Sequence, residues 1–168
     1  MLTSHELLGF MSPPLALDIL TYVYENDKAL YRATLSAVAE ARKLRPVFLE
    51  RQPKPQRHAA MLATLARPAL DLVTGNLIRT WLLKKHKTML AEFLDALAIT
   101  HEEGVVEQLP ASMDDTKLRA AVDALLAKHP PETVAVYLHA FNEMNGQEWP
   151  NLTAMLNSDP RLQLGAPA

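Results

Sequence analysis

The chain has 168 residues, of which 49% are hydrophobic and 21% are charged, and it contains no cysteine. A chain of this length and composition is typical of one globular domain that buries its own core without a metal or a disulfide. The missing cysteines exclude disulfide bonds, thiol catalysis and cysteine-ligated zinc or iron–sulfur sites in this chain. Leucine and alanine dominate while only five residues are glycine, which favours helix over sheet.

The net charge of −2 conceals an uneven distribution along the chain. Residues 1–87 hold 13 Lys and Arg against 7 Asp and Glu, a net charge of +6. Residues 88–168 hold 4 Lys and Arg against 12 Asp and Glu, a net charge of −8. Such asymmetry indicates either a charged partner or attraction between the two halves within the fold.

No secretory leader begins the sequence, because no basic stretch precedes an apolar core at residues 1–20. No apolar run approaches the ~20 residues that a membrane-spanning helix needs. We therefore expect a cytoplasmic protein that does not interact with membranes.

The first predicted elements are three helices within residues 3–45. Thr3 and Glu6 have the spacing of a capping box, which predicts a short helix through Phe10. Ser12 followed by Pro13 predicts a second helix start, with proline at the first helical position. Asp27 can cap a third helix, which Pro46 is expected to end near residue 44 or 45.

Residues 45–57 are predicted to form a basic, proline-rich connector. Pro46, Pro53 and Pro55 interrupt it, and residues 47–49 are expected to form one helical turn that docks on the core. A helix containing Met61 and Leu65 follows and stops before Pro68. Residues 69–97 contain no proline, and their length favours two helices with a break within residues 84–87.

Residues 100–113 are acidic, contain Gly104 and Pro110, and are predicted to form a loop. Residues 105–106 could add a short extended patch there. Ser112 is expected to cap the next helix, and helices at 131–145 and 150–156 follow, bounded by prolines and by Gly146. The sequence thus predicts an all-α fold of one domain over residues 1–168, an irregular orthogonal bundle of seven to nine helices. A short solenoid-like superhelix is the second choice.

Signatures of common chemistries are missing from the sequence. No two of the five glycines lie within five residues of each other, so neither phosphate-binding glycine motif is present. The serine-hydrolase elbow and the zinc-protease motif are also missing. We therefore predict no cofactor, no metal and no catalytic residue. His139 and Glu143 share a helix face, but a surface hydrogen bond explains that spacing better than a metal site.

A second cluster of titratable residues could form a pocket around the acidic loop. His101, Glu102 and Glu103 follow the helix that carries Asp95, and together these groups could hold a cation or a basic ligand. A solvated loop is the preferred interpretation. An enzyme or small-ligand binder that uses His101, Asp95 or His139 is accordingly the third functional hypothesis.

The basic residues within 42–57 support the first functional hypothesis. On this hypothesis the protein is a non-enzymatic helical module that binds a protein partner or itself. The predicted partner-binding residues are Arg42, Lys43, Arg45, Arg51, Lys54 and Arg57. Nucleic-acid binding is the alternative, because Arg79, Lys84, Lys85 and Lys87 flank Trp81. The pI of about 6.3 and the placement of Trp81 on an apolar helix stripe both argue against it.

Overall fold

The computed structural model describes residues 2–165, and over these residues it contains ten α-helices, two 3₁₀ helices and no strand. This confirms the all-α prediction. In chain order the helices are α1 (Ser4–Phe10), α2 (Pro13–Asn26), α3 (Lys28–Ala41), α4 (Pro46–Glu50), α5 (Lys54–Leu65), η1 (Pro68–Leu70), α6 (Asp71–Lys85), α7 (Lys87–Ala96), α8 (Asp115–Lys128), α9 (Pro131–Asn145), α10 (Pro150–Ser158) and η2 (Pro160–Leu162). Ten exceeds the predicted seven to nine because residues 46–50 form a helix of their own.

The described residues group into two compact units, residues 2–81 and residues 82–165, and α6 runs from one into the other. The predicted break within residues 69–97 is confirmed, because α6 ends at Lys85 and α7 begins at Lys87. No helix in the described part of the chain combines the length and the apolar composition that crossing a membrane requires.

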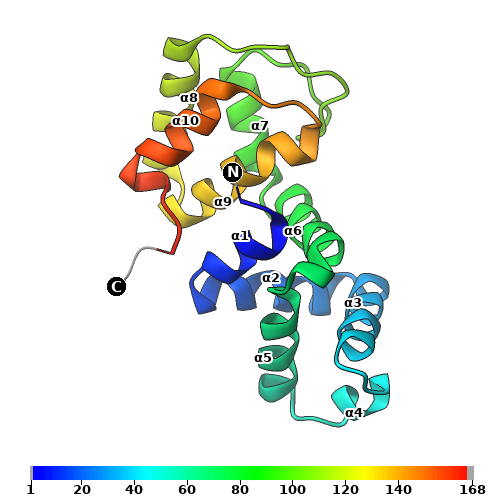
Figure 1. Ribbon diagram of the computed structural model, residues 1–168. Helices are drawn as coiled ribbons and strands as arrows, with labels where there is room; N and C mark the ends of the chain where they lie inside the picture. The colour runs from blue at the N-terminus through cyan, green and yellow to red at the C-terminus, as the bar shows by residue number, and fades with distance from the viewer. Residues whose placement is uncertain (1, 166–168) are drawn as a thin grey trace. The chain divides into compact units, whose positions relative to one another are not determined.

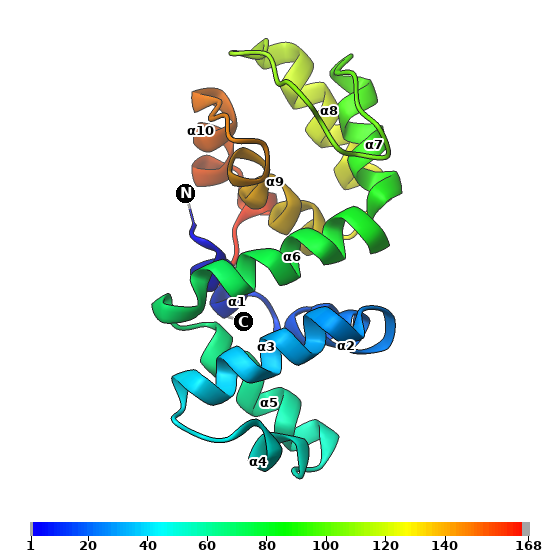
Figure 2. The same cartoon turned by 90° about the vertical axis from the view of Figure 1, so that its right-hand side faces the viewer.

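In the unit of residues 2–81, α2 packs against both α3 and α5, and α4 packs against α3 at the end of the unit (Figures 1 and 2). The capping box is formed, since Glu6 Oε2 accepts a hydrogen bond from the Thr3 amide at 2.9 Å. Asp27 caps α3 as predicted by accepting from the Leu30 amide at 3.0 Å. Trp81 is fully buried and its Nε1 donates to Asp18 Oδ2, which confirms its assignment to the core.

The unit of residues 82–165 has an aromatic core. Its fully buried rings are Phe93, Tyr137, Phe141 and Trp149. α7 packs against α8, and α9 packs against α8, α10 and η2. Gly146 ends α9 with a φ of 65°, the left-handed conformation that favours glycine. The N-cap of α8 is Asp114 rather than the predicted Ser112, because the Asp114 carboxylate accepts from the Lys117 amide at 3.0 Å.

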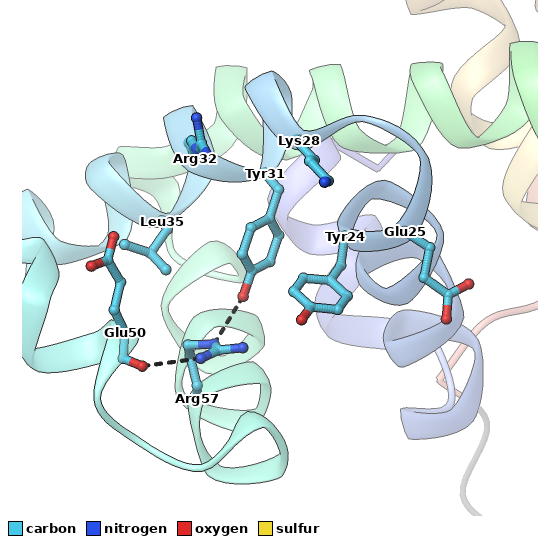
Figure 3. A pocket seen from close by; sticks show the side chains of 8 residues that line it. All are labelled: Tyr24, Glu25, Lys28, Tyr31, Arg32, Leu35, Glu50 and Arg57. Atoms are coloured by element: carbon cyan, nitrogen blue, oxygen red, sulfur yellow. Dashed lines mark hydrogen bonds between the residues drawn. The ribbon is translucent and has the colours of Figure 1, made fainter.

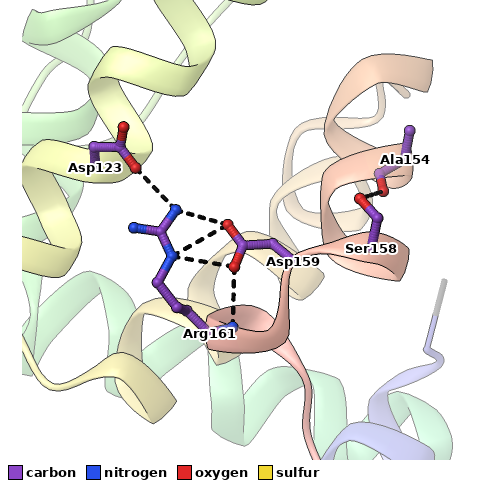
Figure 4. A network of polar contacts seen from close by, with 5 residues as sticks. All are labelled: Asp123, Ala154, Ser158, Asp159 and Arg161. Carbon is purple, nitrogen blue, oxygen red and sulfur yellow. Dashed lines mark hydrogen bonds and ion pairs between the residues drawn. The ribbon is translucent and has the colours of Figure 1, made fainter.

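An ion-pair network joins η2 to α8 within the same unit (Figure 4). The Arg161 guanidinium lies 2.9 Å from Asp123 Oδ1 and 2.7 Å from Asp159 Oδ2. Hydrogen bonds from Arg161 hold the pKa of the Asp159 carboxyl below its usual range. Because Arg161 and Asp123 are half exposed, the network positions the end of the chain and adds little stability.

The two tryptophans allow the prediction of a single domain to be tested. Trp81 lies in the first unit and Trp149 in the second, and both are fully buried. In W81F the remaining tryptophan, Trp149, reports urea unfolding, and in W149F the reporter is Trp81. If the chain is one cooperative domain, we expect the fluorescence transition of each variant to coincide with its circular dichroism transition. Fluorescence that changes at a different urea concentration from the circular dichroism in either variant would show that the units unfold separately.

Candidate functional site

Most of the predicted connector at 45–57 is helical: the helical turn expected at residues 47–49 is part of α4, and α5 begins at Lys54. Pro46 occupies the first position of α4, and Pro53 and Pro55 lie at the start of α5. Proline fits the first turn of a helix because the amide it lacks has no intrahelical partner there. These prolines therefore begin helices, and α3 ends earlier than predicted, at Ala41.

A mixed apolar and basic surface surrounds α4. Leu49 is fully buried and anchors the helix, whereas Leu44, Val47 and Phe48 are 39%, 37% and 54% exposed. Four of the six predicted partner-binding residues are exposed in the same stretch of chain: Arg42, Lys43, Arg45 and Arg51. We call these seven exposed residues, Arg42, Lys43, Leu44, Arg45, Val47, Phe48 and Arg51, the α4 surface.

The other two predicted residues, Lys54 and Arg57, lie against aromatic side chains of α2 and α3. Lys54 Nζ is 4.5 Å from the centroid of the Tyr24 ring, which is a cation–π distance. Arg57 Nε donates a hydrogen bond to the Tyr31 hydroxyl at 3.0 Å. The structure therefore divides the predicted set into four residues on the α4 surface and two beside the aromatic rings.

A buried histidine extends this second group. The Tyr31 hydroxyl lies 2.9 Å from His58 Nε2, and His58 is 1% exposed. Burial, together with the charges of Arg57 and Lys54, lowers the pKa of His58 to about 4. His58 is thus neutral at pH 7 and is hydrogen-bonded to the Tyr31 hydroxyl. Sequence reasoning missed this residue because nothing in its local sequence indicates that it is buried.

The acidic loop, residues 100–113, lies in the unit of residues 82–165 and is exposed. The side chains of Glu102, Glu103 and Glu107 are exposed to solvent. Val105, which lies between them in the chain, is 47% exposed. The short extended patch predicted near residue 105 is present as an isolated antiparallel bridge between Glu102 and Val105. A pocket of about 780 Å³ is lined by Val105, by these three glutamates and by Leu83, and Lys84 and His101 line it as well.

His101 and Asp95, which the sequence placed in one predicted cluster, are in contact. Both ring nitrogens of His101 are engaged in hydrogen bonds. His101 Nε2 lies 2.7 Å from Asp95 Oδ1, and the Gly104 amide donates to His101 Nδ1 at 3.1 Å. With both nitrogens engaged, the imidazole positions the loop rather than acting as a base. No group of three or more metal-ligating side chains exists among the described residues.

His139 does not form the predicted surface hydrogen bond with Glu143. The His139 ring is buried, and its Nε2 donates to the Leu162 carbonyl at 3.3 Å, which ties α9 to η2. Burial lowers the pKa of His139. The hydrogen bond between His139 and the Leu162 carbonyl is therefore part of the packing of η2 on α9.

The Trp81 ring is fully buried, so it cannot stack on a base as the nucleic-acid hypothesis required. No family model, curated protein or solved structure matches this chain.

Proposed function

We propose that this protein is a helical interaction module that associates with itself, the α4 surface of one copy binding the acidic loop of a second copy. The observation that carries this proposal is the exposed Phe48 on the five-residue helix α4, which exposed Arg42, Lys43 and Arg45 precede and exposed Arg51 follows in the chain. An exposed aromatic ring surrounded by Arg and Lys is the composition of a binding hot spot.

Charge complementarity favours the acidic loop of a second copy as the segment that binds the α4 surface. Residues 42–51 contain four Lys and Arg and one Glu, a net charge of +3. The acidic loop, residues 100–113, contains three Glu and no Lys or Arg, a net charge of −3. Opposite charges of this kind raise the rate of encounter and fix the register of a complex.

Each surface also offers apolar side chains to the other. Phe48 and Val47 are exposed on the α4 surface, and Val105 is exposed at the pocket of the acidic loop. Burying a ring such as Phe48 contributes about 1.5–3 kcal/mol to an interface. Because the α4 surface comprises seven residues, the interface is at the small, transient end of the range.

The contact joins two different surfaces. One such contact per pair of copies builds rings or open chains, whereas two reciprocal contacts close a two-fold dimer. In both cases we expect the mean mass to rise with protein concentration and to fall as salt screens the charges.

The test is sedimentation velocity at several protein and salt concentrations. We expect the wild type to associate at low salt, and both R45E/R51E and E102K/E107K to remain monomeric because each presents like charges to its counterpart. Mixing the two variants should restore association, since the reversed α4 surface of one then meets the reversed loop of the other. The matched control is R67E/R79E, which changes the net charge equally at exposed residues away from α4.

A wild type that stays monomeric at low salt up to millimolar concentration would overturn the proposal. So would association that R67E/R79E weakens as much as R45E/R51E does. Loss of association in F48A with wild-type circular dichroism would identify the ring as the anchor of the interface.

A further inference from the structure

A pocket of about 550 Å³ lies beside α5, in the unit of residues 2–81 (Figure 3). Its size falls within the range of small-ligand sites. Tyr24, Tyr31 and Leu35 supply apolar walls, and Arg57 and Lys28 supply positive charge. The α4 surface contains none of these side chains, so the pocket is separate from the proposed interface.

Arg57 is held in a fixed orientation at this pocket. Its Nε donates to the Tyr31 hydroxyl at 3.0 Å, and its Nη1 donates to the Glu50 carbonyl at 3.2 Å. Arginine can only donate, so the Tyr31 oxygen accepts from Arg57, and the same hydroxyl is hydrogen-bonded to His58 Nε2 at 2.9 Å. This chain of hydrogen bonds orders the guanidinium before any ligand arrives.

The partners of Arg57 leave its charge uncompensated. They are a phenol and main-chain carbonyls, and Arg57 forms no ion pair with any residue that the structure describes. The Glu50 carboxylate is directed away from the guanidinium, although its carbonyl accepts from it (Figure 3). A half-buried, ordered cation without an anion is a binding site for one, because charge-assisted hydrogen bonds to guanidinium are strong.

The surrounding side chains narrow the class of anion. Lys28 and Arg32 add two further cations at the pocket, and Lys54 lies over the Tyr24 ring. The carboxylates of Glu25 and Glu50 also lie at the pocket and would repel a multiply charged anion such as phosphate. The two tyrosine rings are in an edge-to-face arrangement with centroids 4.9 Å apart, and they favour a flat apolar body.

We propose that this pocket binds a small aromatic monocarboxylate, with the carboxylate on Arg57 and Lys28 and the ring against Tyr24, Tyr31 and Leu35. Tyr31 acts as a positioning residue, since it orients Arg57 through the Nε hydrogen bond. The site requires no second copy of the chain and does not depend on the proposed self-association.

The test is titration calorimetry of the full chain with benzoate and 4-hydroxybenzoate, with benzyl alcohol and inorganic phosphate as comparison probes. We expect the two carboxylates to bind and the neutral alcohol and phosphate to bind at least about tenfold more weakly. R57Q should lose at least about tenfold in affinity, because it removes the charge and the fork of donors. R79Q is the matched control, at an exposed side chain that belongs to neither the pocket nor the α4 surface, and should bind as the wild type does.

Circular dichroism of R57Q checks that the variant folds. K28Q provides a second test at an exposed side chain and should also weaken benzoate binding. Y31F should weaken benzoate binding less than R57Q does, since it releases Arg57 without removing its charge. Absence of carboxylate binding at millimolar concentration would overturn the proposal, as would equal affinity of the wild type and R57Q. Preference for inorganic phosphate over benzoate would overturn it too. E102K/E107K should bind benzoate normally, which separates this result from that of the self-association test.

Discussion

F141A is expected to lower the free energy of unfolding of the unit of residues 82–165 by about 3–5 kcal/mol. The Phe141 ring is fully buried, and its centroid lies 5.4 Å from Phe93, 5.8 Å from Tyr137 and 5.1 Å from Trp149. Truncation removes the apolar contacts of α9 with both α7 and the residue that precedes α10. It also leaves a cavity that rings held on three separate segments cannot fill by a small shift.

Urea denaturation of W81F/F141A, compared with W81F, measures this effect through the fluorescence of Trp149 alone. F10A is the matched control, because the Phe10 side chain is 48% exposed and its truncation should change stability by less than about 0.5 kcal/mol. A loss below about 1 kcal/mol for F141A would contradict the packing described for this core.

His58 is expected to make the unit of residues 2–81 less stable in mild acid. Its pKa is about 4 in the folded protein, below the ordinary value of 6.5. Between these pH values the unfolded chain binds more protons than the folded chain, so the free energy of unfolding falls as the pH falls from about 6.5 to 4. Burial is the main cause of the shift, and Arg57 and Lys54 oppose the protonated ring as well.

The loss of stability should be about 1–2 kcal/mol, less than the full shift implies because solvent screens the charges of Lys54 and Arg57. Urea denaturation of W149F at a series of pH values, followed by the fluorescence of Trp81, measures it. H58Q should abolish most of this pH dependence, although it also lowers stability at pH 7 by removing the hydrogen-bond partner of the Tyr31 hydroxyl. An unchanged pH dependence in H58Q would contradict the assignment of a neutral, buried His58.

The helical class and most helix ends could be predicted from the sequence because they depend on local interactions. The capping box at Thr3 and Glu6, the Asp27 cap and the left-handed Gly146 each involve residues within one helical turn. Proline was the exception within residues 45–57. The same residue type ends a helix or begins one, and only the backbone that follows distinguishes the two outcomes.

The candidate sites depended on contacts between residues far apart in the chain. Tyr31 and His58 are 27 residues apart, and His139 meets the Leu162 carbonyl across 23 residues. Local sequence could show that 42–57 is basic, which is why Arg42, Lys43, Arg45 and Arg51 were identified together. It could not show that Lys54 and Arg57 turn toward Tyr24 and Tyr31, because that depends on the packing of α5 against α2 and α3. Periodicity and capping are local and fix the helices, whereas burial and the orientation of charges are decided only when the helices pack.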